Sequence, residues 1–283
     1  MSTRKIKLTV QYDGADYRGW QIQPGHRTIQ GELSDAVTSL VGRKITVHGA
    51  SRTDAGVSAL GQVAVFEIVN CPIPTENFQQ AINDRLPQDI VVAEAVEATK
   101  DFDVIGGAKS KLYRYTIYAG PTRPVLEIRH CWHVAAKLDV ERMNQAAQYL
   151  VGEHDFKSFA TSKDKRESSV RTVFRCEVEA SSVIPAQPIL SVVEGAGIHE
   201  PSDEGRATSD GWLYVDIEGD GFLYNMVRNI VGSLVEVGIG RWPADKMKTV
   251  LEAKDRTAAG PIAPAQGLCL MCVNYESHRE NPK

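Results

Sequence analysis

Residues 51–57, Ser-Arg-Thr-Asp-Ala-Gly-Val, place one carboxylate between an arginine and a glycine. The neighbouring residues alternate as strands do, in Ile45–His48 before this stretch and in Gln62–Phe66 after it. Asp54 is therefore expected on a loop held by sheet on both sides, a geometry that suits a carboxylate positioned to react. An ordinary turn has the same pattern, since Asp bonds its own backbone and Gly takes a positive φ. The loop alone leaves both interpretations open.

The residues on either side of this loop predict the elements that position it. Alternating apolar residues indicate a strand at 8–12 and another at 62–69. Between them a helix is expected, with Thr28 as its N-cap and an apolar stripe formed by Ile29, Leu33, Val37 and Leu40. A second short helix from Pro74–Thr75 and a strand at 91–96 follow. This split βαβ order is the ferredoxin-like arrangement that RNA-recognition domains also use.

The second half of the sequence repeats the theme at larger scale. A strand is expected at 113–117, a helix from about Asp139 with Gly152 as its stop, a strand at 212–218 and an apolar helix at 223–234. We therefore predict an α+β fold of two ferredoxin-like, RRM-like halves, with largely antiparallel sheets facing a central cleft.

The predicted halves are residues 1–105, which carry the Asp54 loop, and residues 106–283, and they join at the flexible pair Gly106-Gly107. The second half includes a loop insertion at about 181–209, rich in Pro, Gly, Ser and acidic residues. No function is assigned to this insertion.

Composition favours a soluble, cytoplasmic protein. The chain of 283 residues is 42% hydrophobic and 24% charged, and no apolar run approaches the roughly 20 residues of a membrane helix. Five cysteines in a chain of this size indicate no disulfide framework. Cys269 and Cys272 form a C-x-x-C within an expected buried strand, where their odd spacing predicts thiols on opposite faces. They are interpreted as structural residues, and no metal site is predicted.

The net charge of −4 is unevenly distributed. Residues 157–175 carry six Lys or Arg against two acidic residues, whereas residues 181–209 carry four acidic residues against one Arg. The overall charge is therefore a poor guide to binding partners, and a local basic face for phosphate binding remains open.

Five groups of residues together resemble the TruA family of tRNA pseudouridine synthases. They occur in the family's order, and the resemblance as a whole extends from about residue 6 to residue 275. They are Tyr12-Asp13-Gly14 with Gly19-Trp20-Gln21-Ile22-Gln23-Pro24, Arg52 to Val57, Tyr113-Arg114-Tyr115, Gly152 to Phe156, and Gly221 to Asn229. Any one of these motifs could arise by chance, but five in order make the resemblance highly specific.

The resemblance implies an enzyme that breaks the N1–C1′ bond of a uridine in tRNA, turns the base and rejoins it through C5. The implied substrate is the anticodon stem-loop, at positions 38, 39 and 40, and the implied assembly is a homodimer in which the cleft binds RNA. Such an isomerisation requires no cofactor or metal ion, and the sequence has no P-loop, dinucleotide fingerprint or metal-ligand cluster.

The resemblance also implies roles for single residues. Asp54 corresponds to the catalytic aspartate, acting as a nucleophile or a base, and Arg228 is expected to pair with it and offset the rise in pKa that burial causes. Tyr113 would stack on the uracil and assist proton transfer at C5. Arg52 would help to flip the target base or hold a phosphate. Further phosphate contacts would come from Lys109, Lys111, Arg114 and Arg171, with Lys157, Lys163, Lys165 and Arg166 as other candidates.

The chain departs from the family's pattern at several positions. The family usually has Gly at Ser51 and His at Ser58, and a His-Ala-Arg run where this chain has Asp103-Val104-Ile105. The acidic insertion is not typical either. None of these departures touches Asp54, so they bear on RNA affinity and on the choice of site rather than on activity.

Two other functions stay open on the residues alone. A non-catalytic RNA-binding protein of two RRM-like halves would have no use for Asp54 with Arg228, and the RNP1 pattern of aromatics is not evident. A glycoside or nucleoside hydrolase would need a second, opposed carboxylate, which cannot be picked from the sequence. Without the resemblance, Tyr113 fits a core strand position equally well, and Arg228 fits a helix-surface ion pair.

Overall fold

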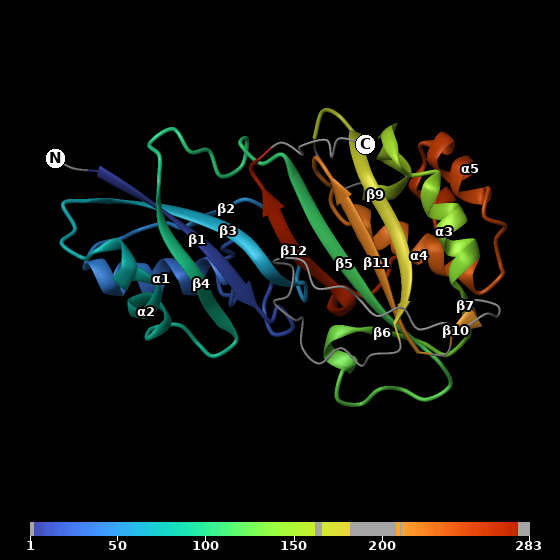
Figure 1. Ribbon diagram of the computed structural model, residues 1–283, viewed down its shortest axis with the longest axis horizontal. Coiled ribbons are helices and arrows are strands. Elements are labelled where there is room, and N and C mark those ends of the chain that lie inside the picture. Colours follow the sequence, from blue (N-terminus) through green and yellow to red (C-terminus); the bar gives the residue numbers. More distant parts are fainter. Residues whose placement is uncertain (1–2, 162–165, 182–207, 210, 277–283) are drawn as a thin grey trace, which may run out of the picture.

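A single ten-stranded sheet runs through the computed structural model, which describes residues 3–161, 166–181, 208–209 and 211–276 (Figure 1). Its strands follow the order β4-β1-β3-β12-β5-β11-β9-β8, with β2 beside β3 and β6 beside β5. They are β1 (Thr3–Tyr12), β2 (His48–Gly49), β3 (Ser58–Val69), β4 (Ile90–Ala98), β5 (Ser110–Ala119), β6 (Trp132–Val134), β8 (Gly152–Asp155), β9 (Val170–Ser181), β11 (Gly211–Gly219) and β12 (Leu268–Asn274). A separate pair joins β7 (Leu138–Asp139) to β10 (Thr208–Ser209).

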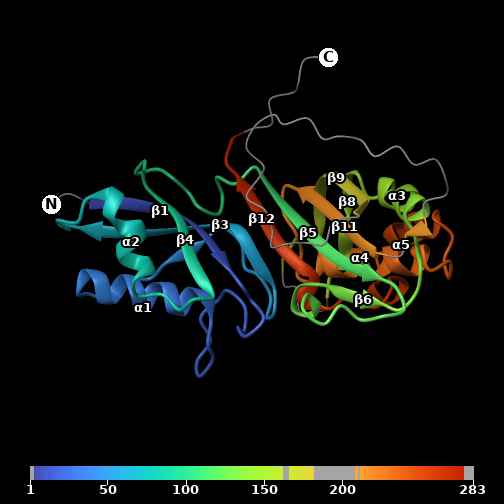
Figure 2. The ribbon, with the colours of Figure 1, turned by 60° about the horizontal axis from the view of Figure 1, so that its bottom comes forward.

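The helices gather at the two ends of this sheet, as Figures 1 and 2 show. In the described residues they are α1 (Ile29–Val41), α2 (Phe78–Asn83), α3 (Val140–Gln148), α4 (Met226–Gly238) and α5 (Lys246–Ala253), with 3₁₀ turns η1 (Thr75–Asn77), η2 (Ile128–His130), η3 (Phe156–Phe159), η4 (Arg256–Ala258) and η5 (Ala265–Gly267). Helices α1 and α2 pack together beside β4, whereas α3 packs against β9, α4 and α5.

Strand β12, near the end of the chain, joins the strands of the first half to those of the second. It pairs in parallel with the start of β3, where Cys269 is opposite Ser58, and antiparallel with β5. Gly61 permits this approach, because a Cβ there would lie 2.3 Å from the carbonyl oxygen of Met271. The α+β class and the mostly antiparallel strands agree with the prediction from sequence, but one continuous sheet replaces the separate sheets expected for two halves.

The predicted boundary at residues 105 and 106 falls in the loop between β4 and β5 and stays a prediction. Of the insertion predicted at 181–209, the structure describes only Ser181 and the short strand β10, and the remainder lies outside the described residues.

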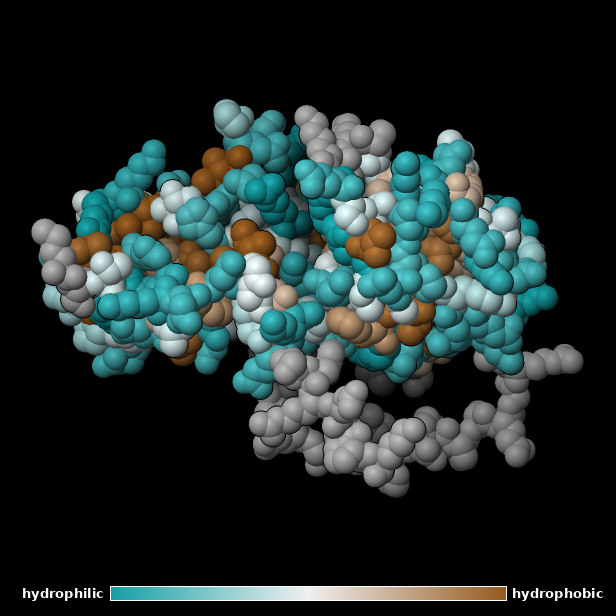
Figure 3. Space-filling model, turned by 90° about the horizontal axis from the view of Figure 1, so that it is seen from above, coloured by the Kyte–Doolittle hydropathy of each residue, from teal (hydrophilic) through white to brown (hydrophobic). Residues whose placement is uncertain are grey.

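No helix in the described ranges is long and apolar enough to cross a membrane. The face seen in Figure 3 is largely hydrophilic, with apolar side chains in separate patches.

Helix α1 begins at the predicted cap. The Thr28 hydroxyl accepts a hydrogen bond from the Gly31 N–H at 3.3 Å, and the helix ends at Gly42, whose φ is 71°. In its predicted apolar stripe, the side chains of Ile29, Leu33 and Val37 are fully buried. The local signals of capping and periodicity therefore place this helix correctly.

The strand predicted at residues 45–48 is wrong over most of its length. The hydroxyls of Thr38 and Ser34, both on α1, accept hydrogen bonds from the backbone N–H groups of Ile45 and Val47 at 3.0 Å and 3.1 Å. Because helix side chains bind this backbone, only the short β2 joins the sheet, beside β3. The loop that carries Asp54 still lies between two strands.

The predicted placement of the two neighbouring cysteines on opposite faces of a strand is also wrong. Cys269 is opposite Arg114 of β5 and Cys272 is opposite Leu112, and residues two apart on a strand share a face. A register shift between Leu270 and Cys272 inserts one extra residue into β12. Both thiols are free and partly exposed, and the described residues contain no group of three side chains suited to hold a metal ion.

Candidate functional site

A cavity of about 890 Å³ lies beside the junction of β3, β12 and β5. The loops before α1 and before β3 line one side, and β5 with the start of α4 lines the other. Its charged and aromatic lining residues are Arg18, Arg52, Asp54, Lys111, Tyr113, Arg166, Phe222, Tyr224 and Arg228. The described lining thus holds five cations and a single carboxylate, that of Asp54.

The backbone of the Asp54 loop is fixed by buried side chains beneath it. The Tyr12 and Thr53 hydroxyls are 2.8 Å apart, and the backbone N–H of Trp20 donates to the Thr53 carbonyl at 3.1 Å. The fully buried Gln62 accepts from the Ser51 N–H at 3.2 Å and donates to the Ser51 carbonyl at 2.8 Å. These bonds hold the residues on both sides of Arg52 in one conformation.

Gly56 closes the turn after Asp54 in a left-handed conformation, with a φ of 81°. Its N–H donates to the Tyr17 carbonyl at 3.3 Å, and the Val57 N–H donates to the Asp54 carbonyl at 3.1 Å. A Cβ at position 56 would lie 3.2 Å from the side chain of Ala265. Glycine therefore serves here for a tight bend packed against a neighbouring segment.

Arg228 approaches Asp54 from the start of α4, with Nη1 3.7 Å from Oδ2. Its guanidinium is held in place by two other bonds, from Nε to the Ala263 carbonyl at 2.8 Å and from Nη1 to the Asn225 side chain at 3.1 Å. Both members of the pair are well buried, with side-chain exposures of 16% for Arg228 and 18% for Asp54. Two segments 174 positions apart are thus brought together.

Burial raises the pKa of Asp54 above the usual value for an aspartate, and the positive charge of Arg228 counteracts part of that rise. The sequence predicted that Arg228 would offset the effect of burial, and the net direction shows that it does so only in part. A carboxylate with a raised pKa is a stronger base when ionised.

Tyr113 lies across the cavity on β5 and is 6% exposed. Its ring packs edge-on against Phe222, with the centroids 5.2 Å apart and the planes at 85°. Its hydroxyl lies 2.9 Å from the Ser51 hydroxyl. Burial raises the pKa of Tyr113 to about 12, so the phenol is neutral at physiological pH. An aromatic ring with one polar tip therefore meets the Asp54 loop.

The structure places the predicted substrate-binding cations in two groups. Arg52 and Lys111 line the cavity, whereas Lys109, Arg114 and Arg171 are not among its lining residues. Residues alternate along β5, so Lys111 shares the face of Tyr113 while Arg114 lies on the opposite face.

Arg114 is instead committed to an ion pair on that opposite face. It binds both carboxylate oxygens of Asp216 on β11, from Nε at 2.8 Å and from Nη2 at 2.7 Å, and lies over the ring of Tyr214 at 4.8 Å. A guanidinium paired in this bidentate way has little capacity left for a phosphate.

Arg18 is a cavity cation that sequence reasoning missed. It follows the first motif and directly precedes the Gly-Trp-Gln run, but a lone arginine in a loop carries no sign of where it points. Arg166, only a secondary candidate from sequence, also lines the cavity, and its Nη1 binds the Phe222 carbonyl. Burial lowers the pKa of Lys111, and Arg166 adds to that effect.

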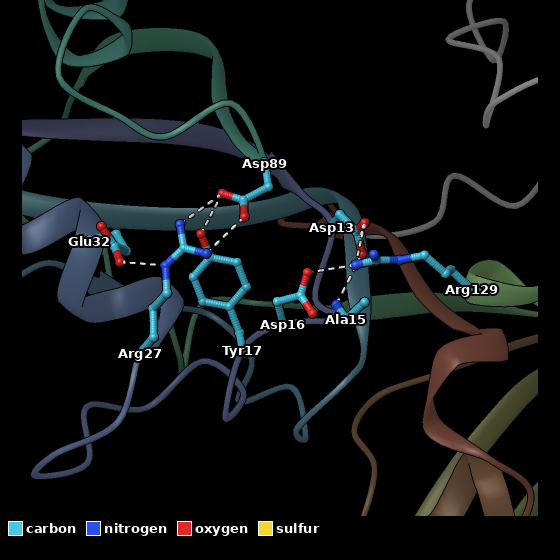
Figure 4. A network of polar contacts seen from close by, with 8 residues as sticks. All are labelled: Asp13, Ala15, Asp16, Tyr17, Arg27, Glu32, Asp89 and Arg129. Carbon is cyan, nitrogen blue, oxygen red and sulfur yellow. Dashed lines mark hydrogen bonds and ion pairs between the residues drawn. The ribbon is translucent and has the colours of Figure 1, made fainter.

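A network of polar contacts, drawn in Figure 4, binds the loop that carries Arg18 to other residues of the first half of the chain. Arg27 binds Asp89 through Nη1 at 3.0 Å and Nη2 at 3.2 Å, and binds Glu32 through Nε at 2.9 Å. Its guanidinium lies 4.3 Å from the ring centroid of Tyr17, whose hydroxyl donates to Asp89. Tyr17 is also the residue whose carbonyl binds the turn after Asp54.

The same loop contacts the second half of the chain. Arg129, between β5 and β6, lies 2.6 Å from Asp16 and 3.9 Å from Asp13 (Figure 4). These pairs are largely exposed, so each contributes little to stability.

Comparisons with known proteins agree on one family. A family model described as tRNA pseudouridine synthase matches residues 8–105 and 146–276. The chain is 42% identical over 272 residues to tRNA pseudouridine synthase A of Acetivibrio thermocellus, covering 96% of this chain and 100% of that protein. The protein of the same name from Geotalea uraniireducens is 40% identical, with the same coverage. That of Geobacillus kaustophilus is 42% identical over 277 residues, covering 97% of this chain and 95% of that protein.

Proposed function

The chain belongs to the tRNA pseudouridine synthase family, and from that premise we propose that it isomerises uridines at positions 38, 39 and 40 of the tRNA anticodon stem-loop. In this reaction the N1–C1′ bond breaks and a C5–C1′ bond forms, while C5 loses a proton and N1 gains one. One observation carries the proposal for this site: among the cavity-lining residues that the structure describes, a single buried carboxylate lies with five cations. The cations suit a polyanionic substrate, and the carboxylate supplies the reactive group.

Asp54 acts as the nucleophile or the base toward the target uridine. The positive charge of Arg228 keeps a useful fraction of Asp54 ionised against the cost of burial, and the 3.7 Å separation of Nη1 and Oδ2 leaves carboxylate oxygen available to substrate. The position of Arg228 is supported by its bonds to Ala263 and Asn225, which hold it while Asp54 reacts.

Tyr113 supplies the surface on which the flipped uracil stacks, and its phenol assists the proton transfer at C5. Arg52 occupies the space that the base leaves or holds a phosphate, and Lys111, which also lines the cavity, binds phosphate. Lys109 and Arg171 are proposed as contacts to more distant phosphates. Arg114 is left out because Asp216 occupies its guanidinium.

A homodimer and a cytoplasmic location complete the proposal. One active site that serves three neighbouring positions must hold the body of the tRNA while the loop adjusts, and a second subunit provides that support. Light scattering of the purified protein, free and with tRNA, tests the assembly: a monomer under both conditions would remove the dimer and leave the chemistry intact.

Incubation of the purified protein with an unmodified tRNA transcript that has uridine at all three positions tests the substrate. Pseudouridine is mapped at nucleotide resolution, and formation at positions 38, 39 and 40 is expected. Pseudouridine found only elsewhere in the tRNA would overturn the choice of site. No pseudouridine at any position would overturn the proposed activity.

A further inference from the structure

A hydrogen bond between Ser51 and Tyr113 links the Asp54 loop to the opposite wall of the cavity. The two hydroxyl oxygens are 2.9 Å apart, and either can be the donor. In the part of the chain that the structure describes, Ser51 is the one hydrogen-bond partner of the Tyr113 hydroxyl. The contact spans 62 positions of sequence, so it exists only because β12 brings β3 and β5 together.

The backbone that carries the Ser51 hydroxyl is held in place by Gln62 on β3. Gln62 is fully buried and bonds both the N–H and the carbonyl of Ser51, at 3.2 Å and 2.8 Å. The amide of Gln62 thus uses one donor and one acceptor on a single residue. Movement of the Ser51 backbone relative to β3 would require breaking this buried pair of bonds, which is costly.

The Tyr113 ring is fixed by packing, but packing alone leaves its hydroxyl hydrogen free to rotate. The edge-on contact with Phe222 sets the plane of the ring. A phenol has one donor and can also accept, and the bond to Ser51 uses one of these two capacities. The other capacity of the phenol is then available to a ligand in the cavity, which both residues line.

We propose that Ser51 is a positioning residue that orients the Tyr113 hydroxyl toward the base bound in the cavity. This inference rests on the proposed function, in which the phenol assists proton transfer at C5. Ser51 acts through Tyr113 and not through its own contact with RNA. Its contribution therefore falls on the chemical step and disappears when the phenol oxygen is absent.

A double-mutant cycle in single-turnover kinetics tests this inference, with Ser51→Ala, Tyr113→Phe and the double variant. Ser51→Ala is expected to slow pseudouridine formation about fivefold, the factor that one net hydrogen bond represents, with the half-saturating tRNA concentration unchanged. In the Tyr113→Phe background the same change should have no further effect. Ser51→Thr keeps a hydroxyl and should restore most of the rate.

Additive effects in the cycle would show that Ser51 acts independently of Tyr113 and would overturn the inference. A rise in the half-saturating tRNA concentration with an unchanged rate would do the same, since it indicates direct RNA binding. These results leave the proposed function standing, because they require an active wild-type enzyme. The same cycle measured by thermal unfolding shows whether each variant is folded: coupling in unfolding without coupling in rate would reduce Ser51 to a structural role and overturn the inference.

Discussion

Two Arg–Asp pairs in this molecule use the same residue types in opposite ways. Arg114 binds both oxygens of Asp216 at 2.7 Å and 2.8 Å, on facing positions of β5 and β11. Nη1 of Arg228 and Oδ2 of Asp54 are 3.7 Å apart. Both oxygens of Asp216 thus accept short hydrogen bonds from its partner, whereas the contact that the described residues show between Asp54 and Arg228 is longer, at 3.7 Å.

The two pairs differ because each guanidinium donates its hydrogen bonds to different acceptors. Arg228 uses Nε on the Ala263 carbonyl and shares Nη1 with Asn225, so it offers Asp54 charge more than hydrogen bonds. Arg114 presents its fork to Asp216 in the bidentate geometry that is strongest for this pair. The bidentate pair of Arg114 with Asp216 stabilises the sheet. The longer contact of Arg228 with Asp54 leaves a carboxylate that can react.

Replacing each aspartate by asparagine gives the largest predicted contrast. Asp54→Asn removes the reactive charge with little change of shape and should lower the single-turnover rate of pseudouridine formation by at least about 10³-fold, with tRNA still bound. Asp216→Asn is the matched control and should keep the rate of the folded enzyme. Binding of tRNA by Asp54→Asn with unchanged pseudouridine formation would remove the enzymatic role of Asp54.

Replacing Arg228 should also slow pseudouridine formation. Arg228→Gln removes the charge beside Asp54 and is expected to slow the reaction about 10²-fold at neutral pH. Arg228→Lys keeps the charge without the planar fork and should be intermediate. An Arg228→Gln enzyme as fast as the wild type would show that Asp54 does not depend on its partner.

The two asparagine variants should rank in the opposite order when the free energy of unfolding is measured. Asp216 is 8% exposed, and its loss leaves the Arg114 guanidinium without its bidentate partner. Asp216→Asn is expected to lower the free energy of unfolding by about 2 kcal/mol, measured by urea titration. The comparison fails if Asp54→Asn destabilises the fold more than Asp216→Asn does.

A smaller effect should separate two lysines close in sequence. Lys111 lines the cavity and Lys109 does not. Lys111→Ala should weaken tRNA binding about tenfold and reduce the slope of its salt dependence by about one, because one phosphate contact is lost. Lys109→Ala should change the affinity less, and equal losses in both variants would show that the cavity does not set phosphate binding.

The sequence predicts those parts of the fold and the site that depend on neighbouring residues or on a recognisable motif. Helix α1 and its Thr28 cap follow from periodicity and capping chemistry, and the Asp54 loop follows from the motif that contains it. The pairing of β12 with both β3 and β5 could not be predicted, because a buried strand does not reveal its neighbours. That pairing turns two expected sheets into one and brings Tyr113 to the Asp54 loop.

Long-range partners account for the remaining differences. Arg114 was predicted as a phosphate contact from its charge, and the sequence gives no sign that it pairs with Asp216, 102 positions later. Arg18 was missed because its place in the cavity depends on contacts of its loop with distant residues. The bulge in β12 that puts Cys269 and Cys272 on one face has no sequence signal in the alternation of that strand.

The pH dependence of the single-turnover rate tests most directly whether Asp54 reacts under the control of Arg228. Asp54 must be ionised to react, and its pKa is raised by burial, so as the pH falls the rate should begin to drop above the ordinary aspartate pKa of about 3.9. Removing the positive charge in Arg228→Gln raises the pKa further and should move this acid limb to higher pH by about one unit, while Asp216→Asn leaves it in place. An acid limb that stays where it is in Arg228→Gln would contradict the account.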